Sequence, residues 1–237
     1  MQSEYCSPCM LSSCIVSTGT VPSSIGLLTQ LEWIGLVNNR FSGTLPSEIG
    51  QLTRVTTLTA YNNALEGPLP TEMGLLTGIK LLRIGDNQFT GLLPSELGLL
   101  TSLEVRLNLE YNQFSGTVPT ELGLLTRLKG LNLHGNRLLG PIPSEFGLLT
   151  ELGTLTLANN SLSGSVPQEL LALQASLYAM SFEGNLLLSG TIPEVICSIN
   201  GTCVESALST CESTGLSFDC SSLLCGCECS CEGGTST

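Results

Sequence analysis

Residues 128–150 read LKGLNLHGNRLLGPIPSEFGLLT, and this stretch decides the fold. Leu131 and Leu133 alternate with polar residues, and a period of two over so few residues predicts a short β-strand. Gly140 permits a tight backbone conformation, and Pro143 then stops a second short strand ahead of a brief helical turn. The stretch therefore predicts short elements joined by frequent turns.

The same pattern recurs along most of the chain. The prolines that mark it lie 24 to 26 residues apart: Pro22, Pro46, Pro70, Pro94, Pro119, Pro143, Pro167 and Pro193. Asparagines keep the same period: Asn39, Asn63, Asn87, Asn112, Asn136, Asn160 and Asn185. A fixed period of this length indicates stacked repeats, in which the inward leucines of one unit pack on those of the next. We predict that each asparagine is buried and donates its amide hydrogens to backbone carbonyls that would otherwise stay unpaired.

Each unit reads roughly L-x-x-L-x-L-x-x-N-x-L-x-G-x-L/I/V-P-x-E-L/I-G-x-L-T, which resembles the plant-type leucine-rich repeat over residues 19–196, as seven full units and a partial first one. The recurring Gly-Leu-Leu-Thr and the cysteine-dense tail look like the repeat proteins common in diatoms and related algae. The resemblance implies an α/β fold, a curved, right-handed leucine-rich-repeat solenoid with a parallel sheet of about seven short strands on its concave face. It also implies a protein similar to receptor ectodomains and polygalacturonase inhibitors.

The cysteines lie outside the repeats, at both ends of the chain. We predict a Cys-containing cap at residues 1–18 and a Cys-rich, acidic cap at residues 197–237, both stapled by disulfides. Thiolate binding of zinc by the C-x-C run at 225–231 is an alternative, but we assign no metal and no cofactor. Disulfides, together with N-glycosylation sequons at Asn159 and Asn200, predict an extracellular or cell-surface protein.

The distribution of charge excludes several partners. The net charge is −12, all eight basic residues lie between Arg40 and Arg137, and ten acidic residues follow Arg137. A surface so poor in cations cannot neutralise phosphates, so we expect no nucleic acid and no anionic lipid as partner. Residues 1–10 lack a basic leader and an apolar run, and no segment approaches the ~20 apolar residues of a membrane span. We therefore expect any membrane anchor to lie outside this chain.

The side chains between the inward leucines should face the concave surface and form the contact surface for a ligand. Aromatic residues and arginine are the usual anchors of protein interfaces. The candidate residues are Trp33, Tyr61, Arg83, Asp86, Arg106, Glu110, Tyr111, Asn132 and His134. The alternative is an ordinary solvated sheet face, as the threonines and small residues of the last units suggest.

A column of carboxylates follows the prolines: Glu48, Glu72, Glu96, Glu121, Glu145 and Glu169. One hypothesis is a ridge that shares bound calcium. The simpler one is that the Ser or Thr before each Glu caps a short helical turn, whose N-terminal end favours a carboxylate. The threonine ladder from Thr29 to Thr150 suggests an ice-binding surface, but repetition alone explains it. One extra residue near Val105 and Arg106 predicts a local bulge or twist of the sheet.

The sequence contains one histidine, His134, and no nucleophile elbow, Walker loop or kinase signature. Nothing supplies it with a nucleophile, an orienting group and oxyanion donors together, so we predict that the chain is not an enzyme. We predict a non-catalytic module that binds a protein, peptide or glycan through its concave β-surface. The alternative is a structural, cation-binding protein of the cell wall or extracellular matrix. The sequence leaves the oligomeric state open.

Overall fold

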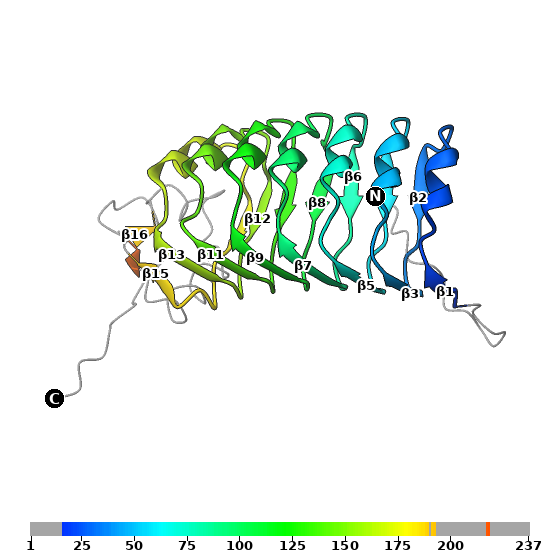
Figure 1. The fold of residues 1–237 in the computed structure, drawn as a ribbon. Helices are drawn as coiled ribbons and strands as arrows, with labels where there is room; N and C mark the ends of the chain where they lie inside the picture. Colours follow the sequence, from blue (N-terminus) through cyan, green and yellow to red (C-terminus); the bar gives the residue numbers. More distant parts are fainter. Residues whose placement is uncertain (1–15, 190, 193–216, 219–237) are drawn as a thin grey trace, which may run out of the picture.

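A computed structural model of the 237-residue chain describes residues 16–189, 191–192 and 217–218. Short strands and 3-10 helices alternate along the chain and stack side by side as a solenoid (Figure 1). The predicted Cys-rich caps, 1–18 and 197–237, fall outside the described residues except at 16–18 and 217–218. Among the described residues, no helix is long and apolar enough to span a membrane.

One long side of the solenoid is a parallel sheet of seven strands, which confirms the predicted number. The strands are β2 (Trp33–Gly35), β4 (Thr57–Thr59), β6 (Leu81–Arg83), β8 (Arg106–Asn108), β10 (Gly130–Asn132), β12 (Thr154–Thr156) and β14 (Ala179–Ser181). Each strand buries its middle residue, which is at most 5% exposed. The first and third residues therefore point to the opposite side, away from the core.

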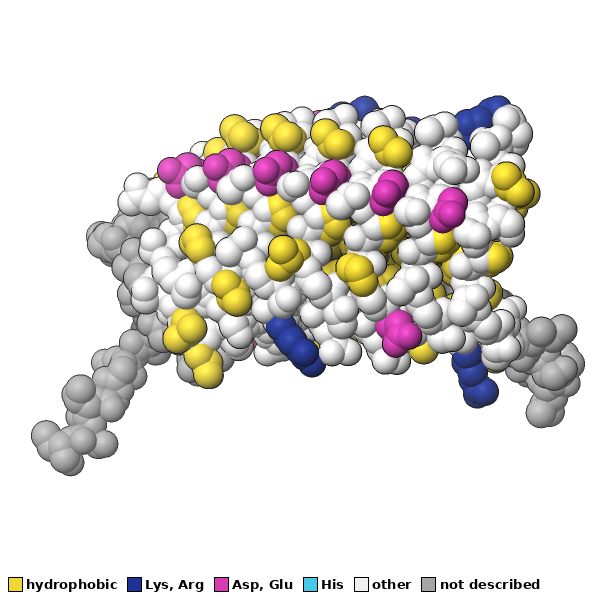
Figure 2. Space-filling view, in the orientation of Figure 1, with side chains coloured by type: hydrophobic (Ala, Val, Ile, Leu, Met, Phe, Trp, Pro, Cys, Tyr) yellow, Lys and Arg dark blue, Asp and Glu magenta, His cyan; other side chains and the backbone are white. Residues whose placement is uncertain are grey.

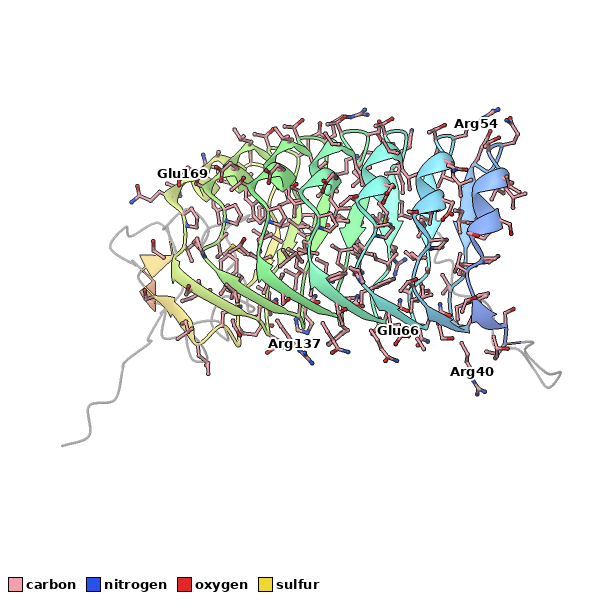
Figure 3. The ribbon with its side chains drawn as sticks, viewed as in Figure 1. Arg40, Arg54, Glu66, Arg137 and Glu169 are labelled. Carbon is pink, nitrogen blue, oxygen red and sulfur yellow. The ribbon has the colours of Figure 1, made fainter. Side chains whose placement is uncertain are left out.

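A second parallel sheet runs along the neighbouring side. Its eight strands are β1 (Thr18–Thr20), β3 (Arg40–Gly43), β5 (Ala64–Gly67), β7 (Gln88–Leu92), β9 (Gln113–Thr117), β11 (Arg137–Gly140), β13 (Ser161–Ser165) and β15 (Leu187–Ser189). A short pair, β16 (Thr191–Ile192) with β17 (Ser217–Phe218), follows it. The side chains of Arg40, Glu66 and Arg137 project outward from this sheet (Figure 3).

Short 3-10 helices close each repeat. They are η1 (Ser23–Leu27), η2 (Ser47–Gln51), η3 (Thr71–Leu75), η4 (Ser95–Leu99), η5 (Thr120–Leu124), η6 (Ser144–Leu148) and η7 (Gln168–Leu173). The predicted Ser or Thr cap is wrong, because a proline holds every N-cap position and no side chain caps the helix. The hydroxyl instead donates to the adjacent carboxylate, as Ser47 Oγ does to Glu48 at 3.4 Å.

The extra residue near Val105 does not interrupt the seven-stranded sheet. Leu107 of β8 is in register with Leu82 on one side and Leu131 on the other. In the neighbouring repeats the residue before the strand and the first strand residue donate to one carbonyl, as Lys80 and Leu81 do to Thr56, whereas Glu104 and Val105 donate to Lys80 one position earlier. The extra residue therefore lies at Val105 and Arg106, at the start of β8, where the sequence predicted a local irregularity.

The core is a continuous column of leucines with buried phenylalanines between the sheets and the helices. Phe89 and Phe114 stack with their ring centroids 6.1 Å apart. The asparagines form the predicted ladder beside this column; those from Asn87 to Asn185 are buried as predicted, whereas Asn39 and Asn63 are only partly buried. The Nδ2 of Asn136, for example, donates to the carbonyls of Leu109 and Leu133 at 3.0 and 3.1 Å, and its Oδ1 accepts the N–H of Phe114. Each repeat is thus tied to its neighbours by hydrogen bonds as well as by apolar contact.

Candidate functional site

The solvent side of the seven-stranded sheet, which we call the seven-stranded face, carries the predicted contact residues. Its members are the first and third residues of each strand and the second and third residues that follow the strand, since the residue directly after the strand, such as Ile84 or Leu133, is buried in the core. All nine candidates lie there: Trp33, Tyr61, Arg83, Asp86, Arg106, Glu110, Tyr111, Asn132 and His134. They come from five of the seven strands and the turns after them, so the candidate surface is built from residues far apart in the sequence.

Tyr61 and Arg83 meet across neighbouring repeats. The guanidinium carbon of Arg83 lies 4.6 Å from the ring centroid of Tyr61, a cation–π contact. The Nε of Arg83 is buried and has no hydrogen-bond partner among the described residues. The ring of Tyr61 therefore holds the guanidinium of Arg83 in place on this face.

A hydrogen-bonded carboxylate occupies the centre of the seven-stranded face. Glu110 accepts a hydrogen bond from the Nδ2 of Asn108 at 3.0 Å and another from the Nδ2 of Asn132. The Oδ1 of Asn108 in turn accepts the N–H of Glu110, and the Oδ1 of Asn132 accepts the N–H of His134, both at 3.0 Å. The carboxylate of Glu110 is thus fixed in position by two neighbouring strands. Sequence reasoning missed Asn108, which is only 3% exposed, although it occupies the same strand position as Asn132.

Asp86 adds a second carboxyl group beside this cluster. Its backbone is left-handed, with φ of 52°. Partial desolvation, and then the charge of Glu110, raise the pKa of Asp86 above its ordinary value. The neighbouring carboxyl groups of Asp86 and Glu110 favour a cationic group of the ligand beside them, and Arg83 and Arg106 lie on the same face.

The rings of Tyr111 and His134 form an edge-to-face pair. Their centroids lie 4.7 Å apart, with an interplanar angle of 80°. Tyr111 stays 54% exposed, so the pair presents an aromatic surface to solvent. The Glu110 carboxylate is bonded by asparagines instead of His134, so no histidine–carboxylate pair forms here. This arrangement suits contact with a ligand better than proton transfer.

Glycines make room for the large side chains of this face. Trp33, 63% exposed, lies over Gly35, where any Cβ would collide with its ring. Arg106 lies over Gly130, whose Cβ would come within 3.2 Å of the Nε. A Cβ on Gly135 would come within 2.8 Å of the Tyr111 ring. Each anchor therefore lies against backbone, which limits its freedom before any ligand arrives.

Sequence reasoning also missed Tyr178, which is 60% exposed and would meet a Cβ on Gly153 at 2.5 Å. The sequence pattern that could have identified Tyr178 is an aromatic residue just before the strand β14, with a glycine at the equivalent position of the preceding repeat.

The helical side of the solenoid has a different character. Figure 2 shows the predicted row of carboxylates there, one from each of the helices η2 to η7, with apolar side chains beside it. The exposed leucines of this side are Leu27, Leu75, Leu99, Leu124 and Leu148. Within the described part of the chain, no three His, Cys, Asp or Glu residues lie close enough to hold a metal ion together.

Comparisons with known proteins find a leucine-rich repeat family model and receptor structures. A family model described as a leucine-rich repeat region matches residues 9–138. A TDR receptor structure superposes with a TM-score of 0.72 at 33% identity, over 86% of this chain and 33% of the receptor chain. The Arabidopsis receptor kinase HAESA, in complex with the peptide hormone IDA and the co-receptor SERK1, gives a TM-score of 0.68 at 29% identity, over 78% of this chain and 31% of that chain.

A plant ice-binding protein is also similar, with a TM-score of 0.66 at 26% identity, over 80% of this chain and 58% of that one. This chain thus spans about a third of the length of the two receptor chains. A search of curated proteins gave no match.

Proposed function

This chain belongs to the leucine-rich repeat family, and from that premise we propose that it is a non-catalytic, receptor-like binding module. Its ligand is an extended peptide or a protein loop, bound outside the cell across the seven-stranded face. The HAESA ectodomain holds a peptide hormone and a co-receptor, which supports a peptide or protein as ligand here. The extracellular setting rests on the terminal cysteines and the two sequons.

The observation that carries the proposal is the set of pre-positioned anchors on one face. Trp33, the Tyr61/Arg83 pair and the Tyr111/His134 pair are all held by neighbouring repeats or by backbone. Aromatic and arginine anchors of this kind dominate binding energy, and little side-chain freedom is left to lose when a ligand binds. Neighbouring strands lie ~4.8 Å apart, so seven strands span roughly 30 Å, the length of about nine extended residues.

Charge defines the ligand further. The carboxyl groups of Asp86 and Glu110 lie at the centre, and Arg83 and Arg106 lie beside them on the same face. A peptide with a basic side chain opposite the carboxyl pair and an acidic one opposite Arg106 complements this pattern. A glycan is a second ligand class, because stacked aromatic rings and fixed polar groups also suit a sugar face.

The proposal is tested by binding of the purified full chain to an array of extracellular peptides, proteins and glycans. Replacing Trp33, Tyr61 and Tyr111 together by alanine should abolish the signal while the circular dichroism spectrum stays unchanged. A calcium-independent hit that is lost in this variant supports recognition by the seven-stranded face.

A matched control replaces Leu99, Leu124 and Leu148 by alanine. These leucines are 53–55% exposed on the helical side and carry no part of the seven-stranded face. The control should bind as the unmodified chain does. If the control loses binding and the aromatic variant keeps it, the ligand binds the helical side and the proposal is wrong.

The carboxylate row of the helices favours one alternative, a structural, cation-binding protein of the wall or matrix. Self-association that requires calcium, without any array hit, would support it. Ice binding has less support than either, because only four threonines lie in the strands of the seven-stranded face: Thr57, Thr59, Thr154 and Thr156.

A further inference from the structure

Asn159 is the first residue of an N-glycosylation sequon, Asn159-Asn160-Ser161. It lies between β12 and β13, is exposed, and has a left-handed backbone with φ of 52°. The next residue, Asn160, belongs to the buried ladder, and its Nδ2 donates to three carbonyls at 3.0–3.2 Å. The sequon therefore offers its glycan-accepting amide on the surface while its middle residue holds the fold.

Glycines flank the exposed Asn159 on both sides. The same turn position is held by Gly135 in the preceding repeat and by Gly184 in the following one, both left-handed. The Oδ1 of Asn159 contacts the backbone of Gly184, so the side chain leans toward the following repeat. The ring of Tyr111 leans the same way, over Gly135 of the following repeat.

We infer that Asn159 carries an N-linked glycan and that this glycan covers the β14 end of the seven-stranded face. The side chains of β12 and β14 that it shields are small: Thr154, Thr156, Ala179 and Ser181. The face from Trp33 to His134 stays open. The glycan thus limits the area of the face that a ligand can contact. This inference rests on the proposed function, because both assume the secretory pathway and a ligand on the seven-stranded face.

The repeats provide a matched control for this site. Asn62 occupies the equivalent turn position, is exposed, and has φ of 58°. It is followed by Asn63 and Ala64, so no hydroxyl completes a sequon there. Ala64→Ser completes one, and a glycan on Asn62 would lie next to Tyr61, inside the open part of the face.

To test this inference, the full chain is secreted from cultured mammalian cells. Its N-linked glycans are released enzymatically in heavy-oxygen water, which labels each asparagine that carried one, and the labelled sites are mapped by mass spectrometry. Asn159 should carry the label, and Asn159→Gln and Ser161→Ala should both lose that glycan completely. An unmodified Asn159 overturns the inference, whatever the state of Asn200. This outcome leaves the proposed function standing, because ligand binding is measured separately on the array.

Hydroxyl-radical footprinting then tests the direction of the glycan. Leu186, 77% exposed and two residues beyond Gly184, should oxidise more slowly in the glycosylated chain than in Asn159→Gln. Trp33 and Tyr111 should oxidise equally in both. In the Ala64→Ser glycoform, protection should move to Tyr61. If Tyr111 oxidises more slowly in the chain glycosylated at Asn159 than in Asn159→Gln, the glycan does not stop at the β14 end of the face, and the inference is wrong.

Discussion

Asn112→Ala is expected to lower the free energy of unfolding by about 3 kcal/mol, because it removes the hydrogen bonds of two amide N–H groups and one amide oxygen at roughly 1 kcal/mol each. The Nδ2 of Asn112 donates to three backbone carbonyls at 3.1–3.2 Å, those of Ile84, Leu109 and Glu110. Its Oδ1 accepts the N–H of Phe89 at 3.0 Å. Asn112 is only 7% exposed, so water cannot replace these partners.

The assay is urea denaturation followed by circular dichroism, with a thermal scan alongside. In a chain of this size about 1 kcal/mol moves Tm by roughly 2–4 °C, so Tm should fall by about 10 °C. Tyr111→Ala is the control, since this neighbouring side chain is 54% exposed. The control should change the free energy of unfolding by no more than about 0.5 kcal/mol, as surface substitutions do. Equal stability of the two variants, or a less stable Tyr111→Ala, would refute the assignment of the buried and exposed faces.

The helix glycines should be sensitive to a single methyl group: Gly98→Ala would bring a Cβ within 2.5 Å of the Glu121 carbonyl oxygen, whereas a Cβ on Gly78 meets nothing closer than 3.5 Å. Urea denaturation should show a loss of about 1–3 kcal/mol for the first and little change for the second, and equal losses would contradict the packing argument. Because the folded state raises the pKa of Asp86, its ionisation destabilises the fold, and this penalty should fade as the pH drops below its ordinary value near 3.8. The free energies of unfolding of Asp86→Asn and of the unmodified chain should thus converge at acidic pH. A difference between them that stays constant across the pH series would contradict this prediction. Glu104→Gln should barely alter Tm, although Lys80 lowers the Glu104 pKa, because ion pairs at the protein surface contribute little, and the Lys80 side chain is 54% exposed; a large drop in Tm would show a structural role.

Much of the candidate site could be predicted from repeat position. The period locates each strand, and the residues between the inward leucines then face solvent, which selected Trp33, Arg106 and the other candidates. The individual contacts could not be predicted. Tyr61 lies under Arg83, and Asn132 binds Glu110, across sequence separations of 22 residues. Such pairs depend on the register between repeats and on side-chain direction, neither of which a single repeat specifies.

One error has a physical cause in the backbone. The hydroxyl of Ser47 was expected to cap a helix, but Pro46 already holds the N-cap position in an extended conformation, so the hydroxyl contacts Glu48 instead. The extra residue near Val105 was located from the sequence: it lies at Val105 and Arg106, at the start of β8, and the strand is in regular register from Leu107 on.

The sequence by itself determined the solenoid, because leucine, asparagine, glycine and proline recur at one period and each has a fixed local role in the repeat. Leucine turns inward, asparagine binds turn carbonyls, and proline ends the second strand before each helix. Only the tertiary structure decided how the candidate side chains contact one another and the backbone of the next repeat. Stacking brings the glycines Gly130 and Gly135 beneath the side chains Arg106 and Tyr111 of the preceding repeat, and a collision with a missing Cβ is a property of two repeats in contact. The repeat is local information, whereas the candidate recognition surface arises between repeats.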